Sequence, residues 1–458
     1  MNITRFEATG VNGYLNFDIS FNDSITFLIG INGSGKTTAI KLILGLLSPS
    51  WINLTQIKYS YAQVECKLQD EYFTIRAEKT DTDKVRLSLS YSDPAKKTIA
   101  SLVKVQDISM INPNEVTRFG LRSLANRYSR FEAHFIDLEV VKSIRLLNSP
   151  VFLGLDRRIH EGSEIDVISM DSFMKERDFT DEIKGNLYES LIEVENLIKN
   201  SFLEYSEKQS KIGSTLKNNI IYSSFDIVKT NDSNESFLNL KNNNLESRKQ
   251  RIIEASSNFE IPDLEDKILN YFDELTRLEA ILKKHSSKSN KMPRSEEMKV
   301  IQQWFVNSPQ LQRIDKIISL YEEAQNEIVN EFQAFFKFEI LANRYFQDNN
   351  KRLKIKKNGE IEIELPNRDI TSIFKLSSGE KQIIVMLAQL IFGKKRQVFI
   401  IDEPELSLHL GWQEIFIDTI QEASPETQFI LATHSPSIIG KIENEEYCVD
   451  LTTDIPYA

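Results

Sequence analysis

The sequence of 458 residues has little cysteine and no long apolar run. Its two cysteines, Cys66 and Cys448, make neither a disulfide framework nor a zinc site, so we expect a reducing, cytoplasmic environment. No stretch of 18 apolar residues is present, and the residues from Met1 to Arg5 do not resemble a signal peptide. These absences predict a soluble, intracellular protein with no membrane partner.

Positive charge is also in deficit, because 56 Lys and Arg residues stand against 67 Asp and Glu residues, for a net charge of −11. This balance argues against broad adhesion to nucleic acid or to a membrane surface. A local basic strip could still exist inside an acidic protein, so DNA binding stays open. The length of the chain allows two or three domains with a sizeable core.

Glycine is scarce, with 16 residues in the chain, yet three glycines fall between positions 30 and 35. The segment Gly30–Thr37 reads G-x-x-x-x-G-K-T between a strand-like run and a helix-like run, which is the context in which this motif binds phosphates. A simple turn is the alternative. Lys36 would place positive charge at the β- and γ-phosphates, and the Thr37 hydroxyl would bind Mg²⁺. The residues expected to bind the nucleotide are Asn32, Gly33, Ser34, Gly35, Lys36, Thr37 and Thr38.

The first 160 residues have the patterns of strands. The expected strands around the glycine-rich turn and after the first helix are Asn2–Phe6, Tyr14–Phe21, Ser24–Ile29, Ile57–Leu68, Glu71–Ala77 and Lys84–Tyr91. Alternating apolar residues and short polar turns in the last three predict an antiparallel meander. The continuous apolar run Val151–Leu155 predicts instead a strand buried on both faces of its sheet.

Residues from about 161 to 345 have a helical character. There is no glycine between Gly213 and Gly359, and apolar residues recur every three or four positions in Ile183–Tyr205, Leu264–Leu282 and Ile314–Phe335. Helices of about 25 residues would make a short bundle or coiled arm rather than a long rod. The segments Lys229–Arg248 and His285–Ser295 read as connections. We therefore expect an all-helical insertion at 161–345, between an α/β half at 1–160 and another at 346–458.

The third part of the chain opens with a hairpin signal. Lys357-Asn358-Gly359 lies between the strand-like runs Arg352–Ile355 and Glu360–Leu365. The most basic local cluster of the chain falls here and consists of Lys351, Arg352, Lys354, Lys356 and Lys357. A solvated strand face is the favoured interpretation, and contact with a phosphate backbone is the alternative.

Two apolar strands near the carboxyl terminus end in residues suited to phosphate chemistry. The run Val398–Ile401 is followed by Asp402 and Glu403, and Gln428–Ala432 is followed by Thr433 and His434. Ligands of parallel sheets lie beyond the carboxyl ends of the strands. We expect Asp402 to hold Mg²⁺, Glu403 to deprotonate the attacking water, and His434 to reach the γ-phosphate. Taken alone, each could be an ordinary strand end.

A further segment, Leu376–Gln382, opens a predicted helix that stops at Gly393. By itself, its Ser-Ser-Gly-Glu sequence could be a helix cap. Together, however, the motifs resemble the ABC-type ATPase heads of the SMC, RecF and OLD group. The matching segments are Gly30–Thr37 (Walker A), Leu376–Glu380 (signature), Val398–Glu403 (Walker B), Glu405–His409 (D-loop) and Thr433–Pro436 (histidine switch).

This resemblance implies an α/β ABC-ATPase head, in which a P-loop parallel sheet core and an antiparallel β subdomain are interrupted by the helical insertion. It also implies that ATP and Mg²⁺ lie between two facing heads. Ser377, Ser378 and Gly379 of one copy would then contact the γ-phosphate bound by the other copy. A homodimer, or a higher oligomer such as a hexamer built from dimers, would complete the site.

Two features depart from these relatives. The OLD nucleases continue into a Toprim domain, whereas only 24 residues follow His434, so we expect no nuclease domain in this chain. The Q-loop has no clear match, and Gln106 is a candidate for it. Arg157 and Arg158 resemble a basic pair of these relatives, and a structural ion pair is an equal interpretation.

Complete ATPase motifs without an effector domain favour a slowly hydrolysing sensor or scaffold ATPase. The chain also resembles the anti-phage ATPases of the Septu and PARIS systems, which implies a separate HNH or Toprim nuclease as partner and a phage-derived trigger. The alternative is a DNA-repair ATPase similar to RecF and SMC proteins that binds duplex DNA. A detached transporter subunit is disfavoured, because such proteins have far less chain than separates Lys36 from Ser377.

Overall fold

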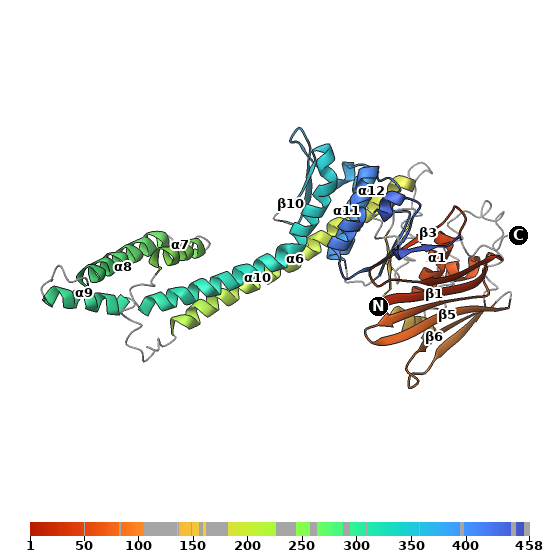
Figure 1. The fold of residues 1–458 in the computed structure, drawn as a ribbon, viewed down its shortest axis with the longest axis horizontal. Helices are drawn as coiled ribbons and strands as arrows, with labels where there is room; N and C mark the ends of the chain where they lie inside the picture. Colours follow the sequence, from red (N-terminus) through yellow and green to blue (C-terminus); the bar gives the residue numbers. More distant parts are fainter. Residues whose placement is uncertain are drawn as a thin grey trace. The chain divides into compact units, whose positions relative to one another are not determined.

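The chain folds into two compact units, of which the first contains Met1–Ser201 and Ala334–Ala458 and the second Phe202–Gln333 (Figure 1). The predicted boundaries at 161 and 345 remain a prediction. The computed structural model describes residues 1–49, 51–81, 84–104, 135, 137–147, 149–154, 159–161, 182–225, 244–256, 263–286, 294–307, 309–356, 358–393, 398–440 and 446–452.

An antiparallel sheet forms one layer of the first unit. Among the described residues it has six strands in the order β2-β1-β4-β5-β6-β7. Alternation of apolar and polar residues explains its two faces, because β2 buries Leu15, Phe17 and Ile19 and exposes the residues between them. The expected meander is confirmed. The strands are β1 (Asn2–Val11), β2 (Leu15–Ser20), β4 (Tyr61–Leu68), β5 (Glu71–Asp81), β6 (Lys84–Tyr91) and β7 (Ile99–Lys104).

A second sheet is built from both ends of the chain. Its described strands follow the order β15-β3-β14-β13-β8-β9, and all pairs are parallel except β8 with β9. Every residue of β13 and β14 is buried, as expected of strands covered on both faces. The strands are β3 (Ile25–Ile29), β8 (Val151–Leu153), β9 (Ile159–Glu161), β13 (Val398–Asp402), β14 (Gln428–Ala432) and β15 (Cys448–Asp450). The predicted α/β fold with parallel and antiparallel sheets is therefore confirmed.

Helices cover these sheets. α1 packs against β4 and β5 of the antiparallel sheet and against β13 of the parallel sheet, so it lies between the two layers. α11 and α12 lie side by side (Figure 1), and α4 packs on β6 and β7. The bounds are α1 (Lys36–Leu47), α2 (Trp51–Gln56), α4 (Glu139–Arg145), α11 (Ser378–Phe392), α12 (Leu410–Ala423) and α13 (Pro436–Ile439).

The side chain of Gln428 connects the two sheets. Its Oε1 accepts a hydrogen bond of 2.8 Å from the backbone N–H of Ile3, and its Nε2 donates bonds of 2.8 Å to the carbonyls of Ile3 and Asn22. Gln428 is fully buried, so these bonds satisfy polar groups that would otherwise be costly to bury. The first strand of the chain is thus joined to a strand near its carboxyl end.

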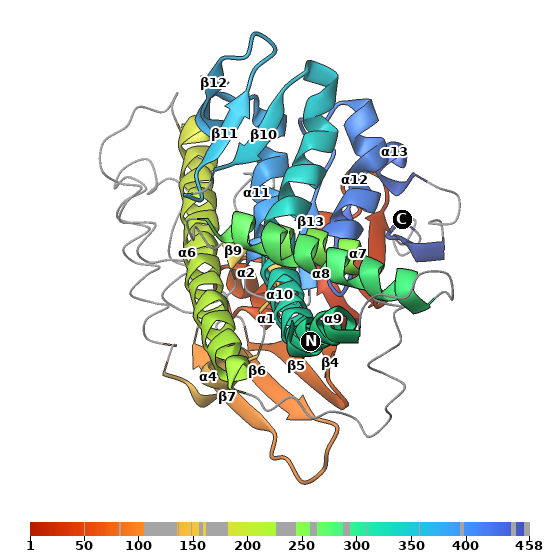
Figure 2. The ribbon, with the colours of Figure 1, turned by 90° about the vertical axis from the view of Figure 1, so that its left-hand side faces the viewer.

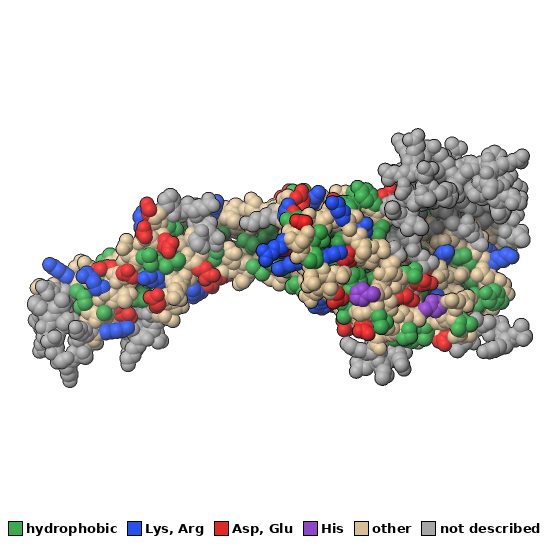
Figure 3. Space-filling model, turned by 90° about the horizontal axis from the view of Figure 1, so that it is seen from above, with side chains coloured by type: hydrophobic (Ala, Val, Ile, Leu, Met, Phe, Trp, Pro, Cys, Tyr) green, Lys and Arg blue, Asp and Glu red, His purple; other side chains and the backbone are tan. Residues whose placement is uncertain are grey.

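A small sheet of β10 (Arg352–Ile355), β11 (Ile361–Glu364) and β12 (Ile370–Thr371) follows the helical insertion (Figure 2). It confirms the predicted hairpin. The basic cluster on it is paired with acids, because Lys354 Nζ lies 2.6 Å from Glu364 and Lys356 Nζ 2.6 Å from Glu362. Lys357 lies outside the described residues. The pairing favours a solvated strand face, and basic and acidic side chains are likewise mixed over the face shown in Figure 3.

From residue 182 to 345, the described part of the insertion is helical with short turns, as predicted, but its longest helices exceed the expected 25 residues. α6 has 43 residues and α10 has 38, and each has parts in both units. α7 begins at Leu245, inside the segment that was expected to be a connection. The bounds are α6 (Glu182–Ser224), α7 (Leu245–Ser256), α8 (Leu264–Ser286), α9 (Arg294–Asn307) and α10 (Pro309–Phe346).

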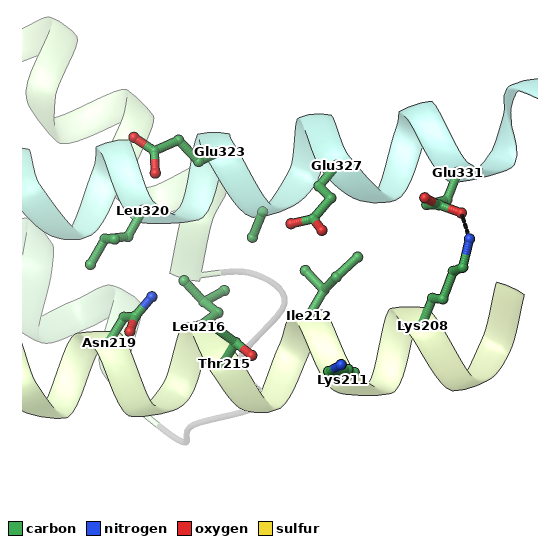
Figure 4. Close-up of a pocket in the computed structure, with 11 residues that line it drawn as sticks. Lys208, Lys211, Ile212, Thr215, Leu216, Asn219, Leu320, Glu323, Glu327 and Glu331 are labelled. Atoms are coloured by element: carbon green, nitrogen blue, oxygen red, sulfur yellow. Dashed lines mark hydrogen bonds and ion pairs between the residues drawn. The ribbon is translucent and has the colours of Figure 1, made fainter.

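The helical unit has its own core and a side groove. Trp304 is almost completely buried among apolar residues of α7, α8 and α10, including Phe272 and Leu311. Between α6 and α10 lies a cavity of about 340 Å³ with charged side chains along its rim, among them Lys208, which forms an ion pair with Glu331 (Figure 4). In the part of the chain that the structure describes, no helix is apolar and long enough to cross a bilayer.

Candidate nucleotide-binding site

Three adjacent parallel strands bring the predicted motifs to one edge of the sheet. Ala432 at the end of β14 is paired with Leu28 of β3 on one side and with Asp402 of β13 on the other. Parallel strands in register end together, so the glycine-rich turn after β3 lies beside the segments after β13 and β14. The order β3-β14-β13 therefore assembles residues that are about 370 to 400 positions apart in the chain.

The glycine-rich turn has the backbone geometry of a phosphate cradle. Gly33 and Gly35 have φ angles of 89° and 91°, which residues with a side chain rarely adopt. A β-carbon at Gly35 would also lie 2.7 Å from the Phe17 ring. α1 begins directly afterwards at Lys36 and has no side-chain cap. The N–H groups of its first turn consequently point out of the helix toward the turn, where they can bind an anion.

Lys36 lies at the centre of this edge. Its ammonium donates a hydrogen bond of 2.9 Å to the Gly30 carbonyl, and the residue is only 6% exposed. Burial lowers the pKa of Lys36, and the negative charges of Glu403, Asp402 and Glu405 oppose that shift. The structure therefore places the predicted Walker A lysine in the electrostatic field of the predicted Walker B carboxylates.

Asp402 fits the expected magnesium ligand. The residue is 4% exposed, and its Oδ1 has no hydrogen-bond partner among the described residues. Burial raises the pKa of Asp402 and the neighbouring Glu403 raises it further, whereas a hydrogen bond with Thr37 lowers it. A buried carboxylate oxygen without a donor, next to a threonine hydroxyl, is an oxygen set suited to Mg²⁺ completed by phosphates and water. The residues present thus fit the metal.

Glu403 has an unusual backbone. Its φ of 50° lies in the left-handed region, which a side-chain-bearing residue adopts at a cost of about 1 kcal/mol or more. The conformation is held by hydrogen bonds, because the Glu403 N–H donates to the Ala432 carbonyl at 2.8 Å and the Leu406 N–H donates to the Glu403 carbonyl at 3.1 Å. The tight turn directs the chain away from the sheet immediately after Asp402 and leaves the Glu403 side chain half-buried beside the P-loop.

His434 follows β14 at the same edge and is exposed. Its backbone N–H donates a hydrogen bond of 2.7 Å to Oε1 of Glu405, and Oε2 of Glu405 accepts a bond of 2.8 Å from the Thr433 hydroxyl. The sequence resemblance assigns Glu405 to the D-loop segment but predicts no contact for its side chain. In the structure it contacts the segment that carries His434, which only the fold could reveal.

The predicted signature forms the start of α11. Ser377 caps the helix: its hydroxyl accepts the Glu380 N–H, and the Glu380 carboxylate accepts the Ser377 N–H at 2.8 Å. Ser378 is exposed at the first helical position. A β-carbon at Gly379 would lie 2.5 Å from the Ser407 carbonyl oxygen, so glycine is needed for this close approach. The signature therefore packs on the turn that follows Walker B in the same chain.

The Glu380 carboxylate is buried and forms an ion pair of 2.8 Å with Lys351, whose side chain is 23% exposed. Burial raises the pKa of Glu380, but the bonds from Lys351 and Ser377 outweigh it and hold the pKa below its usual range. A lowered carboxyl pKa stabilises the folded state above the pKa of the unfolded chain, and this contribution is lost as the pH falls through the lowered pKa of the folded state. The pair therefore anchors the signature helix to the start of β10 at neutral pH.

We expect Lys351→Ala to lower the free energy of unfolding at pH 7 by about 2 kcal/mol, less than for a fully buried pair because Lys351 is partly exposed. Urea unfolding followed by circular dichroism would measure this difference. Lys354→Ala is the matched control, since its pair with Glu364 is solvent-exposed and should contribute little to stability. Equal losses for both variants would contradict the anchoring role of the buried pair.

Some predicted residues cannot be placed, and one additional residue joins the site. Gln106, Arg157 and Arg158 lie outside the described residues. Asp450, at the end of β15, is paired with Ile29 and adds a further negative charge near Lys36. The short strand that carries Asp450 has no distinctive pattern in the sequence, so its position beside β3 could not be predicted.

Comparison with known proteins shows the family of the chain. The family model of the AAA ATPase domain matches residues 1–439. The chain belongs to this family. Family membership supports ATPase activity, and nucleotide binding in such domains generally involves Mg²⁺.

Two curated relatives of this AAA ATPase domain protein are ATPases of retrons. It is 28% identical over 156 residues to the Retron Vc95 probable ATPase of Vibrio cholerae serotype O1 biovar El Tor, a match that covers 30% of each chain. It is 29% identical over 86 residues to the Retron Ec83 probable ATPase of Escherichia coli, with 16% of each chain covered. The matches thus span less than a third of either relative.

Solved structures similar to the chain include two Smc head domains. The head domain of Pyrococcus furiosus Smc with an extended coiled coil, bound to the C-terminal domain of ScpA, matches with a TM-score of 0.36 and 16% identity, covering 96% of this chain and 91% of that chain. The Smc head domain of Pyrococcus yayanosii with a coiled coil and joint matches with a TM-score of 0.32 and 17% identity, covering 96% and 93%.

Proposed function

We propose that the chain binds ATP with Mg²⁺ at the edge formed by β3, β14 and β13 and hydrolyses it slowly. The observation that carries the proposal is the arrangement of Lys36, Asp402 and Glu403 around the glycine-rich turn. Lys36 would neutralise the β- and γ-phosphates with an ammonium already held inside the turn. Asn32 to Thr38 would surround the phosphates with backbone N–H groups.

In this proposal four side chains around the glycine-rich turn have separate catalytic roles. Thr37 and Asp402 would hold Mg²⁺, which when bound neutralises charge on the phosphate oxygens. Glu403 would accept a proton from the attacking water, because it is close enough to Lys36 to affect its pKa and is more exposed than Asp402. His434 would donate a hydrogen bond to the γ-phosphate from the end of β14.

The signature would act on the nucleotide of a second copy. Ser378 is exposed, and the N–H groups of Ser378 and Gly379 precede the first intrahelical bond of α11, whereas the Glu380 N–H is already bonded to the Ser377 cap. Ser378 and these two N–H groups could therefore bind an anion that approaches from outside the chain. Within its own chain, the signature contacts the Ser407 turn. We therefore propose a homodimer in which each ATP lies between the Walker motifs of one copy and Ser377, Ser378 and Gly379 of the other. Such dimers could assemble further into a hexamer.

A mixing experiment tests this arrangement. Lys36→Ala and Ser378→Arg should each abolish ATP hydrolysis when the variant is assayed alone. An equal mixture should recover about a quarter of wild-type activity, because half of randomly paired dimers are mixed and each mixed dimer has one intact site. Continued inactivity of a mixture of folded variants would contradict shared sites, and full activity of Ser378→Arg alone would remove the signature from the site.

The biological role that we propose is that of a sensor or scaffold subunit in a retron-like or related anti-phage system. The similarity to two retron ATPases supports this class of system. A separate effector nuclease of the HNH or Toprim type would be its partner, as in the Septu and PARIS systems. DNA cleavage by the purified chain alone, with ATP and metal, would contradict a separate effector. The pairing of Lys354 and Lys356 with acids weighs against duplex DNA as the principal ligand.

A further inference from the structure

The Glu405 carboxylate joins two loops at the edge of the parallel sheet. Its Oε2 lies 2.8 Å from the Thr433 hydroxyl and its Oε1 lies 2.7 Å from the His434 backbone nitrogen. The Thr433 hydroxyl in turn accepts the Ser435 N–H at 3.0 Å, and Thr433 is 1% exposed. The loop after β14 is thus fixed by one carboxylate that belongs to the loop after β13.

The turn that contains Glu405 is itself fixed at both ends. It begins at Glu403, whose N–H is bonded to the Ala432 carbonyl, and Ser407 within it has a φ of 71° and packs against Gly379 of the signature. A second link joins the same regions, because the Ser435 hydroxyl donates a bond of 2.6 Å to Oε1 of Gln413. Glu405 therefore connects a rigid turn next to the proposed base with the segment that carries His434.

We propose that Glu405 is a positioning residue, which holds the His434 backbone at a fixed place relative to Glu403. This inference rests on the proposed function of the site. The two hydrogen bonds of Glu405 use both carboxylate oxygens on donors of a single loop, so neither oxygen has to meet water or nucleotide for the role to be fulfilled. A shift of the loop by about 1 Å would displace the His434 ring from the γ-phosphate, and such shifts can cost about 100-fold in rate.

The amide variant separates positioning from charge. In Glu405→Gln, the amide oxygen can accept the His434 N–H and the amide nitrogen can donate to the Thr433 hydroxyl. The Thr433 hydroxyl then accepts a bond from residue 405 instead of donating one. Both contacts are therefore retained, while the negative charge near Lys36 is lost and the Thr433 O–H has to find another acceptor. In Glu405→Ala both bonds are lost. A residue that acts as a base or metal ligand would be equally impaired by the two changes.

We expect Glu405→Ala to lower kcat by about tenfold or more without changing the affinity for a non-hydrolysable ATP analogue, because the loop moves while the P-loop stays in place. Glu405→Gln should remain within about threefold of wild type, since its bonds persist. In a His434→Ala background, Glu405→Ala should have no additional effect, because its role passes through that histidine. Glu426→Ala, on the exposed turn before β14, is the control.

Hydrogen exchange at the amide of His434 provides a readout that does not depend on activity. The amide should be protected in wild type and Glu405→Gln and should exchange rapidly in Glu405→Ala. Loss of kcat in Glu405→Gln equal to that in Glu405→Ala, or an additive effect with His434→Ala, would overturn the inference. If Glu405→Ala does not fold, Glu405→Gln alone tests the inference. A kcat within about threefold of wild type and a protected His434 amide would support it, and loss of either would contradict it. If the wild-type chain has no ATPase activity but its His434 amide is protected by Glu405, the proposed function is contradicted and the contact made by Glu405 is not.

Discussion

Lys36→Ala is expected to weaken ATP binding by about 100-fold or more, because a hydrogen bond to a charged group is worth about 1.5–3 kcal/mol and the ammonium would meet two phosphates. The loss should be large because Lys36 is only 6% exposed, so that water cannot replace the missing charge inside the turn. Isothermal titration with a non-hydrolysable ATP analogue and Mg²⁺ would measure it. ATP hydrolysis should fall below detection in the same variant.

Lys97→Ala is the matched control for this experiment, because Lys97 is an exposed lysine of the antiparallel sheet region. It removes the same charge from the protein without touching the proposed site. Thermal unfolding should show both variants folded. An unchanged affinity of Lys36→Ala for the nucleotide would contradict the assignment of Gly30–Thr37 as the phosphate-binding turn.

Glu403→Gln is expected to lower kcat by about 100-fold to 10,000-fold, the range typical of removing a general base. The affinity for ATP should stay close to that of wild type, because the amide has the same shape and the carboxylate binds water rather than phosphate in the proposed mechanism. ATP would then persist in the site, and copies of the chain would remain associated. Light scattering with and without ATP should show a stable ATP-dependent dimer or larger assembly in this variant.

The control is Glu426→Gln, a carboxylate on an exposed turn that should leave kcat and assembly unchanged. Wild-type turnover in Glu403→Gln would contradict the assignment of Glu403 as the general base. Loss of turnover without ATP-dependent association would leave the base assignment intact and would contradict the shared site. The two parts of the proposal can therefore fail separately.

The P-loop and the strands around it could be predicted because their signals are local. The φ angles of Gly33 and Gly35, the start of α1 at Lys36 and the buried run of β13 all follow from short segments of sequence. The position of Asp402 at the same edge also followed, since parallel strands place their carboxyl ends together. A local pattern combined with one rule of sheet topology was sufficient for the core of the site.

Other elements depend on partners far along the chain. β15 has three residues and forms a strand only by pairing with β3, so the position of Asp450 could not be predicted from the sequence. Glu405 meets Thr433 and His434 only after β13 and β14 pair, and no local spacing indicates this contact. α7 begins within a polar, asparagine-containing segment, because burial of residues such as Ile252 and Ala255 in the helical unit outweighs the weak local preference.

The bonds between Gln428 and Ile3 have a consequence for how the protein is made. On the ribosome, β1 emerges before β14, because the partner that satisfies the Ile3 N–H and carbonyl is translated 425 residues later. The strands that pair with β3, which are β14 and β15, are likewise translated much later than β3, and β13 is translated much later than its partner β8. The amino-terminal half therefore cannot complete its parallel sheet during synthesis, and a nascent chain that stalls before residue 428 leaves the inner edge of β3 exposed to chaperones and proteases.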